Sequence, residues 1–364
     1  MNIDPKRRIR NLKSELKKLN IDAMLVTGSS NVSYLSGFTG HDSWLIVGPS
    51  QNYLITDSRY TEQARKQCRH CKVIERKNSL SSAAAEALNK IESIKVAGIE
   101  DDVRLDIYKL VRRKLNSRLI AVKQIVEKLR QVKDDQEIAF IRKAGDIAIN
   151  ALRLTLEQIK CGMSECHLAA MLDYNIQKQS SKPGFDTIVA FGENASQPHY
   201  QPGAVKLKKN DTILIDFGAR YNGYTCDITR CFAFGKANKK YITVYEAVLE
   251  AQQAAIAKIA AGVSVGEVER AARDVITKAG LPQYGHGTGH GLGLDVHEMP
   301  TVSEKITVGK LMVGQVITIE PGVYIPGNLG IRIEDDVVVT KKGCKLLTPS
   351  DFKDPKAINN LSQL

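Results

Sequence analysis

The sequence predicts two domains: an α/β domain in residues 1–128, and an α+β domain with an antiparallel sheet in residues 129–364. Three observations support this prediction. Short helical and strand-like segments alternate in the first third of the chain, which is typical of a mostly buried sheet covered by helices. A long helical periodicity begins near residue 133. Beyond it, strand-rich segments with hairpin signals separate further long helices, so we place the boundary between residues 125 and 133.

The expected elements of the first domain are short. Arg8–Leu19 has the pattern of an amphipathic basic helix, and the turn Gly48-Pro49 separates two short strands. The expected helices are 8–19, 82–90 and 106–115, and the expected strands are 23–27, 44–47, 53–56 and 96–99.

The expected helices of the second domain are longer. Apolar residues recur at helical spacing from Ile138 to Ile159, before a stop at Gly162. Ser164 is expected to cap the next helix, and Gly280 to follow the end of the last one. The expected helices are 138–159, 164–179, 241–261 and 264–279, and the expected strands are 187–191, 212–217, 227–233, 316–319 and 331–340.

The composition is that of an ordinary globular protein, with 43% apolar and 25% charged residues among 364. No stretch approaches the roughly 20 uninterrupted apolar residues of a membrane helix, so we expect no membrane partner. The N-terminus lacks the apolar region of a secretory signal. Seven cysteines spread thinly over the chain fit a reducing compartment. We therefore expect a cytoplasmic protein.

The formal net charge of +12 belongs mostly to the first domain. Residues 1–128 contain 24 Lys and Arg against 14 Asp and Glu, whereas the remaining residues contain 28 against 26. A basic surface can bind nucleic acid, but no recognised nucleic-acid motif accompanies the charge. We interpret the basic residues as solvated helix faces, and we do not expect a nucleic-acid partner.

Two aspartates flank a predicted hairpin. Asp216 ends the apolar run 213–215, and Asp227 follows after Asn222-Gly223, a dipeptide typical of two-residue hairpin turns. With that turn, Asp216 opposes Thr229 and Asp227 opposes Gly218. Because side chains alternate between the faces of a strand, both carboxylates lie on one face as diagonal neighbours, about 7–8 Å apart at the backbone. They could hold one small ion, with Gly218 leaving space open.

A second acidic pair follows the same pattern. Glu320 ends the apolar run 316–319, and Glu334 lies in the alternating segment 331–336 across the turn Pro326-Gly327-Asn328. Buried carboxylates are costly unless they are paired or bind a metal ion. Arg332 can neutralise one charge, but the acids on these strands still outnumber nearby bases.

Five glycines and three histidines are concentrated between Gly285 and Glu298. The glycines make a helix improbable and let the backbone approach a ligand closely. Gly287 stands where the HExxH motif has glutamate, and leucines occupy the third-glycine slots of GxGxxG, so both of those motifs fail.

Charge balance favours a dinuclear metal site. Asp216, Asp227, Glu320 and Glu334 sum to −4, which two divalent ions balance, and a neutral His290 completes the shell of the first ion. Such an oxygen-rich set suits Mn²⁺ or Co²⁺, with Zn²⁺ or Fe²⁺ as alternatives. Two ions about 3.5–4 Å apart would hold a bridging hydroxide and polarise a carbonyl, which is the chemistry of metal-assisted hydrolysis.

The sequence resembles the creatinase/aminopeptidase ("pita-bread") family, and within it the proline-directed peptidases aminopeptidase P and prolidase (Xaa-Pro dipeptidase). The resemblance covers nearly the whole chain, and it implies a creatinase-type N-terminal domain and a pita-bread catalytic domain. The segments on which the resemblance rests are residues 33–38, 56–60, 216–219, 226–230, 286–298, 319–322 and 330–335.

The resemblance also implies a role for each site residue. Asp216 would bind the second metal ion, Asp227 and Glu334 would bridge both ions, and His290 and Glu320 would bind the first. Glu320 would also accept a proton from the attacking water and pass it to the leaving nitrogen.

The other histidines and Arg332 receive roles in the same way. His199 matches a substrate-side histidine, His297 one that stabilises the tetrahedral intermediate, and His286 one that lines the proline pocket. Arg332 would orient the bridging carboxylates. His41 lies in a loop that, in dimers of the family, covers the partner's active site, so we expect it to contact substrate.

The favoured activity is therefore hydrolysis of Xaa-Pro bonds in proline-containing peptides by a homodimer. An Xaa-Pro amide nitrogen carries a ring and no hydrogen, so it needs a dedicated pocket. Methionyl aminopeptidase would leave the first domain unexplained, and creatinase needs no metal ions. The alternative is a non-catalytic pita-bread protein that binds peptide, protein or nucleic acid. Such relatives typically lose metal ligands, and this chain has lost none. Dipeptidase and aminopeptidase P both stay open.

Overall fold

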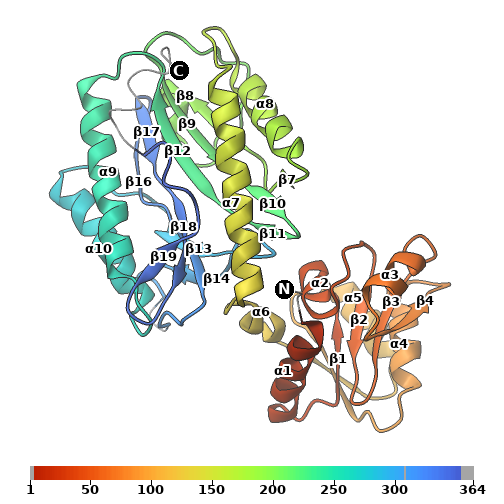
Figure 1. Cartoon of the computed structure of the whole chain (residues 1–364). Coiled ribbons are helices and arrows are strands. Elements are labelled where there is room, and N and C mark those ends of the chain that lie inside the picture. Colours follow the sequence, from red (N-terminus) through yellow and green to blue (C-terminus); the bar gives the residue numbers. More distant parts are fainter. Residues whose placement is uncertain (1–3, 307–308, 354–364) are drawn as a thin grey trace. The chain divides into compact units, whose positions relative to one another are not determined.

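The computed structural model describes residues 4–306 and 309–353, and residues 1–3, 307–308 and 354–364 lie outside the described part. The chain divides into two compact units between Arg130 and Gln131 (Figure 1). No helix within the described ranges is long and apolar enough to span a membrane.

The N-terminal unit is built on a six-stranded mixed sheet in the order β4-β3-β2-β1-β5-β6. The pairs β1–β5, β5–β6 and β3–β4 are parallel, and the others are antiparallel. The four expected strands are present, but β4 and β6, each of which begins with a charged residue, were not predicted. The strands are β1 Ala23–Val26, β2 Trp44–Val47, β3 Asn52–Thr56, β4 Lys72–Glu75, β5 Val96–Glu100 and β6 Arg118–Val122.

Helices cover this sheet. In α1, Ile9, Leu12 and Leu16 are buried at helical spacing, and Asp4 caps the helix by accepting from the Arg7 N–H at 3.0 Å. The three expected helices are present, whereas the short α2 and α3 lack a clear apolar period and were missed. The helices are α1 Pro5–Lys18, α2 Ser29–Ser36, α3 Thr61–Gln67, α4 Leu80–Asn89, α5 Leu105–Lys114 and α6 Ile125–Arg130.

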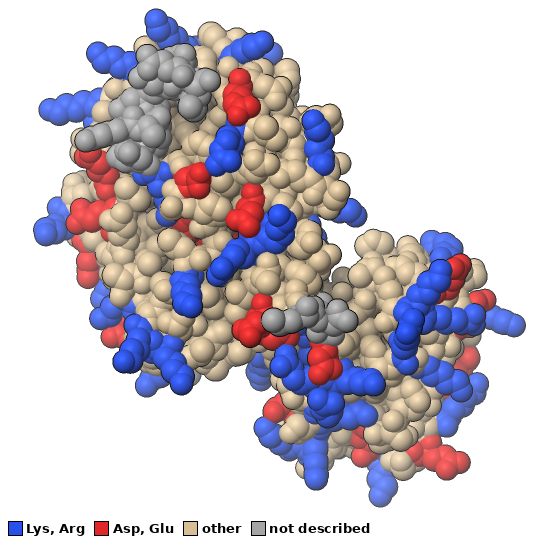
Figure 2. All heavy atoms as spheres, viewed as in Figure 1, with Lys and Arg blue, Asp and Glu red and all other residues tan. Residues whose placement is uncertain are grey.

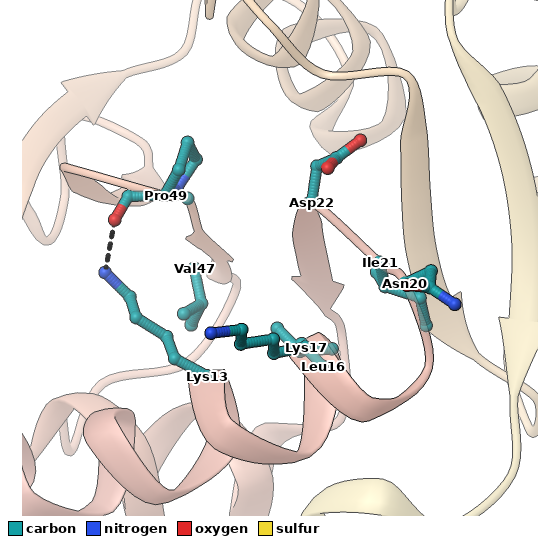
Figure 3. A pocket seen from close by; sticks show the side chains of 9 residues that line it. Lys13, Leu16, Lys17, Asn20, Ile21, Asp22, Val47 and Pro49 are labelled. Atoms are coloured by element: carbon teal, nitrogen blue, oxygen red, sulfur yellow. Dashed lines mark hydrogen bonds between the residues drawn. The ribbon is translucent and has the colours of Figure 1, made fainter.

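The surface of the N-terminal unit is basic without being uniform. On the face drawn in Figure 2, Lys and Arg side chains are interspersed with Asp and Glu side chains. A cavity of about 420 Å³ lies beside α1, where Lys13 Nζ donates to the Pro49 carbonyl at 3.0 Å (Figure 3). The apolar residues Leu16, Ile21 and Val47 are among those that line it. None of the predicted site residues lines this cavity.

The described part of the C-terminal unit contains four long helices, as expected, with α7 packed against α8 and α9 against α10 (Figure 1). A capping box between Asp134 and Glu137 begins α7, and Ser164 caps α8 by accepting from the His167 N–H at 3.3 Å. The helices are α7 Asp135–Leu156, α8 Glu165–Gln177, α9 Lys239–Lys258 and α10 Val265–Lys278, with a 3₁₀ turn, η1, at Gly192–Ser196.

The strands of this unit pair antiparallel, as expected, and the described ones form several sheets. Their orders are β12-β9-β8, β14-β13-β15-β18-β19, β11-β10-β7 and β16-β17. The strands are β7 Lys182–Pro183, β8 Ile188–Phe191, β9 Thr212–Phe217, β10 Ala219–Tyr221, β11 Tyr224–Thr225, β12 Ile228–Ala233, β13 Gly289–Gly291, β14 Glu298–Val302, β15 Val316–Ile319, β16 Gly322–Ile325, β17 Leu329–Arg332, β18 Asp335–Val339 and β19 Cys344–Leu346.

The predicted register of the 216–229 hairpin is confirmed. Tyr221 pairs with Tyr224, and Asp216 pairs with Thr229. Asp227 lies just before β12, at the point where the ladder is interrupted. The prediction that Gly218 leaves space open is wrong, because a β-carbon there would lie 2.1 Å from the Cys226 carbonyl oxygen. Glycine is needed so that the two backbones can approach.

The predicted continuous strand 331–340 is also wrong. It is two strands, β17 and β18, and they belong to different sheets: β17 pairs with β16, and β18 with β15. The chain changes sheets at Ile333-Glu334, which places Glu334 at the break rather than within a strand.

A fully buried arginine holds this break. Arg230 on β12 forms an ion pair with Asp335 at 3.0 Å and donates to four main-chain carbonyl oxygens, including that of Glu334 at 2.7 Å. Breaking a buried ion pair costs about 3–5 kcal/mol; Asp335 would keep its ion pair with Lys353 but lose the buried guanidinium of Arg230.

We expect Arg230→Met to lower the free energy of unfolding by about that amount, as measured by urea denaturation of the metal-free protein. The matched control is Arg153→Met, which removes a half-exposed ion pair with Asp351 and should cost about 1 kcal/mol or less. Equal losses in the two variants would contradict the assignment of the buried pair.

Candidate metal centre

The five predicted ligands lie on strands of the C-terminal unit or directly beside them. Asp216 lies near the end of β9, Asp227 directly precedes β12, and His290 is the central residue of β13. Glu320 directly follows β15, and Glu334 lies between β17 and β18. Residues more than 100 positions apart in sequence therefore meet at one place.

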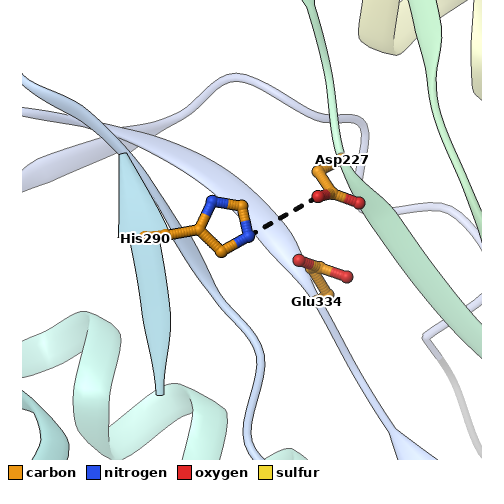
Figure 4. Close-up of side chains that lie close together, drawn as sticks. All are labelled: Asp227, His290 and Glu334. Atoms are coloured by element: carbon orange, nitrogen blue, oxygen red, sulfur yellow. Dashed lines mark ion pairs between the residues drawn. The ribbon is translucent and has the colours of Figure 1, made fainter. Parts of the chain in front are cut away.

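Ligand atoms of Asp227, His290 and Glu334 all lie within 4.8 Å of one another (Figure 4). His290 Nε2 is 3.7 Å from Asp227 Oδ2 and 3.4 Å from Glu320 Oε1. Asp216 is linked to the group through Arg332, whose Nη2 lies 2.7 Å from Asp216 Oδ2. The structure therefore brings together the residues that the sequence predicted as ligands.

Burial and mutual repulsion make the charged forms of these carboxylates unfavourable. Burial, followed by the charges of neighbouring carboxylates, raises the pKa of Asp227 and of Glu334 well above their ordinary values. Burial also raises the pKa of Glu320 to about 7, although Arg332 acts in the opposite direction. The cluster has more negative charge than its protein surroundings neutralise.

Two buried carboxylate oxygens point to what could balance that charge. Within the part of the chain that the structure describes, Oδ1 of Asp216 and Oδ1 of Asp227 are buried and accept no hydrogen bond. Buried polar atoms are almost always satisfied by a partner. Carboxylate oxygens together with one imidazole form a hard donor set, and that set fits divalent ions of the Mn²⁺, Co²⁺, Fe²⁺ or Zn²⁺ type.

His290 is oriented as a neutral ligand. Its Nδ1 lies 3.0 Å from the Gly291 carbonyl oxygen, so Nδ1 carries the hydrogen and Nε2 presents a lone pair to the carboxylates. Burial lowers the pKa of His290 to about 4, which keeps the ring neutral near pH 7.

Arg332 contacts two of the carboxylates, one directly and one through a hydroxyl group. It pairs directly with Asp216, and it reaches Glu334 only through Thr229. Arg332 Nε donates to Thr229 Oγ1 at 3.0 Å, and that hydroxyl donates to Glu334 Oε2 at 2.6 Å. Thr229 was not predicted as a site residue, although the predicted register placed it opposite Asp216.

Two of the remaining histidines lie close to the ligands. His286 Nδ1 is 3.8 Å from Glu320 Oε2, and its Nε2 is 3.0 Å from the Tyr324 hydroxyl. Burial lowers the pKa of His286 to about 4. The ring of His297 is exposed, and its centroid lies 4.4 Å from that of His290.

His199 and His41 are both exposed. His199 follows Pro198, whose carbonyl oxygen accepts from Arg332 Nη1 at 3.4 Å. His41 belongs to the N-terminal unit, whereas the predicted ligands belong to the C-terminal unit.

Tyr324 on β16 is a site residue that the sequence analysis missed. Its hydroxyl accepts from Arg332 Nη1 at 2.8 Å and also contacts His286. Burial raises the pKa of Tyr324 to about 12, so it stays a neutral hydroxyl. The sequence offered no signal for it, because a tyrosine in a short alternating strand is usually a packing residue.

Two glycines of the run allow backbones to pack closely. A β-carbon at Gly289 would lie 2.0 Å from the Thr318 carbonyl oxygen, and one at Gly291 would lie 2.3 Å from the Met299 carbonyl oxygen. The glycines therefore allow β13 to fit between β14 and β15, and this packing fixes the position of His290.

The raised pKa of Glu320 predicts a pH-dependent stability for the metal-free protein. Its value of about 7 in the folded state exceeds the ordinary 4.5, so the folded state binds a proton that the unfolded state releases. The stability from this group is fully present below about pH 4.5 and is lost as the pH rises through about 7.

We therefore compare the free energy of unfolding of metal-free Glu320→Gln with that of the metal-free parent. This difference should shift in favour of the variant by roughly 3 kcal/mol when the pH rises from about 5 to about 8. Urea unfolding in a chelator at both pH values measures this difference. A difference that does not change with pH would contradict the assignment.

Models of known protein families match both units of the chain. The model of metallopeptidase family M24 matches residues 139–341, and that of the creatinase/prolidase N-terminal domain matches residues 8–132. The chain belongs to metallopeptidase family M24. It is a metallopeptidase with a creatinase-type N-terminal domain and a pita-bread catalytic domain.

Relatives of the family cover almost the whole chain. An Xaa-Pro dipeptidase of Pyrococcus horikoshii is 35% identical, over 92% of this chain and 95% of that protein. The structure of an Xaa-Pro dipeptidase from Bacillus anthracis superimposes with a TM-score of 0.91, at 34% identity over 95% of this chain and 98% of that one. The structure of an X-Pro aminopeptidase from Thermotoga maritima superimposes with a TM-score of 0.86, at 36% identity over 92% of this chain and 97% of that one.

Proposed function

We propose that this M24 metallopeptidase is a dinuclear-metal exopeptidase that hydrolyses the Xaa-Pro bond of proline-containing peptides. The observation that carries the proposal is the convergence of four carboxylates and His290 from distant strands, with two buried carboxylate oxygens that accept no hydrogen bond. Relatives described as Xaa-Pro dipeptidases and as an X-Pro aminopeptidase support the choice of substrate.

We assign two divalent ions to this site, Mn²⁺ or Co²⁺, with Zn²⁺ or Fe²⁺ as alternatives. Asp227 and Glu334 would bind both ions, Asp216 the second, and His290 and Glu320 the first. When bound, such ions supply an activated water molecule and polarise the scissile carbonyl.

Glu320 is the proposed general base and acid. Burial raises the pKa of Glu320 to about 7 in the metal-free protein, which supports a role in proton transfer near neutral pH. The carboxylate would take a proton from the attacking water and deliver it to the departing proline nitrogen.

The histidines would act on the substrate. His297, exposed beside the ring of His290, would donate to the developing oxyanion. His286, held by the Tyr324 hydroxyl, would line the proline pocket, and His199 would contact the substrate from its own loop. Arg332 would hold Asp216 in position.

The proposal is tested by turnover of Gly-Pro and of a longer Xaa-Pro-Yaa peptide with Mn²⁺ or Co²⁺ added. Cleavage of either peptide at the bond before proline supports the proposal, and the preferred length separates a dipeptidase from an aminopeptidase P. A metal-loaded protein that cleaves neither peptide would contradict it, and would favour a non-catalytic binding role.

We further propose that the protein is a homodimer in which His41 of one chain contacts the substrate bound by its partner. His41→Ala should then raise KM for an Xaa-Pro substrate, with a smaller effect on kcat. The matched control is His167→Ala, because His167 is an exposed histidine on α8. Unchanged activity and unchanged substrate preference in His41→Ala would remove this role.

A further inference from the structure

Glu165, the first residue of α8, is a fully buried carboxylate outside the metal cluster. Each of its oxygens accepts two hydrogen bonds. Oε1 accepts from the Phe191 N–H and the Asn194 side-chain amide, both at 2.8 Å. Oε2 accepts from the Tyr200 hydroxyl at 2.9 Å and the Gly203 N–H at 3.1 Å.

All four donors belong to one segment, residues 191–203, which runs from the end of β8 through η1 and carries His199. A buried carboxylate must be satisfied to be tolerated, so these hydrogen bonds hold the segment in one conformation. The Tyr200 hydroxyl stays a donor, because burial, followed by the hydrogen bond to Glu165, raises the pKa of Tyr200 to about 12.

The segment is also fixed on its other side. A β-carbon at Gly330 on β17 would lie 1.7 Å from the Ala195 carbonyl oxygen, so the two backbones are in direct contact. The Pro198 carbonyl accepts from Arg332, and Tyr200 donates to Glu165. His199 therefore lies between Pro198, which Arg332 holds, and Tyr200, which Glu165 holds.

We propose that Glu165 is a positioning residue that sets the place of His199 relative to the metal site. This inference rests on the proposed function, because it concerns how His199 reaches the substrate of that reaction. Glu165 touches no reacting group itself, so its removal should act through His199.

The chain provides a matched control. Glu100 in the N-terminal unit is also buried, and it also accepts from two backbone N–H groups, one hydroxyl and one side-chain amide. Its donors are Thr27, Gly28 and Asn31 at the start of α2. Glu100→Gln should therefore disturb local folding as much as Glu165→Gln without changing the environment of His199.

A double-mutant cycle on the metal-loaded enzyme tests the proposal. Glu165→Gln should lower kcat/KM for an Xaa-Pro peptide about 10- to 100-fold, while Glu100→Gln should change it less than about twofold. In a His199→Ala background, Glu165→Gln should have almost no further effect. If the loss of kcat/KM in the double variant equals the product of the losses in Glu165→Gln and His199→Ala, the proposal is overturned.

Tyr200→Phe removes only one of the four donors, and it keeps the test open if Glu165→Gln does not fold. We expect it to lower kcat/KM by a smaller factor, and this effect too should vanish in the His199→Ala background. An effect of the same size in both backgrounds would contradict the proposal.

A second readout does not depend on activity. In Zn²⁺-loaded protein with labelled histidine, the NMR signal that His199→Ala removes identifies His199. Glu165→Gln should shift or broaden this signal, and Glu100→Gln should leave it unchanged. An unchanged His199 signal in Glu165→Gln would overturn the proposal. A parent enzyme without Xaa-Pro activity would refute the proposed function, whereas this NMR comparison would still decide the role of Glu165.

Discussion

Glu320→Gln is expected to lower kcat for an Xaa-Pro peptide by about 10²–10⁴-fold, which is the range for loss of a positioned general base. The side chain keeps its shape, but the amide cannot accept a proton, and it is a poorer ligand for a hard cation. Steady-state kinetics with saturating Mn²⁺ measures the effect.

The control for this prediction is Glu246→Gln, an exposed glutamate on α9. It removes the same charge without touching the cluster, and it should leave kcat unchanged. If Glu320→Gln keeps more than about a tenth of the parent's kcat, then the proton transfer belongs to another residue.

Asp227→Asn is expected to have the second large effect, because Asp227 is proposed to bind both ions. The variant should retain at most one tightly bound ion per chain and lose nearly all Xaa-Pro activity. Metal analysis after desalting, together with kinetics, measures both outcomes.

Metal binding should also be visible as stability. A ligand at about 100 times its Kd stabilises the folded state by about 2.7 kcal/mol, and Mn²⁺ should therefore raise the melting temperature of the parent. Asp227→Asn should lose this increase, whereas Asp146→Asn, an exposed control on α7, should keep it. An equal Mn²⁺-dependent increase in Asp227→Asn would show that the ions bind elsewhere.

Local patterns were sufficient to predict much of the fold. Asn222-Gly223 fixed the register of the hairpin, and with it the pairing of Asp216 with Thr229. The long helices α7 and α9 were found because their buried residues recur at helical spacing. The short helices and edge strands of the N-terminal unit were not predicted, since tertiary packing stabilises them more than their local sequence preferences do.

The change of sheets at Glu334 could not be predicted, because the alternating pattern of residues 331–336 continues through it. What decides the break is pairing with distant partners: β17 with β16, and β18 with β15. For the same reason the local sequence predicted the acids but not Tyr324, which joins the site only because its hydroxyl meets Arg332 and His286.

Anomalous diffraction from crystals of the protein soaked in Mn²⁺ would test most directly whether the five proposed ligands bind two metal ions. We predict two manganese peaks, both within bonding distance of Asp227 and Glu334, with His290 and Glu320 on one and Asp216 on the other. Peaks bound to other residues, or five ordered side chains with no manganese among them, would contradict this prediction.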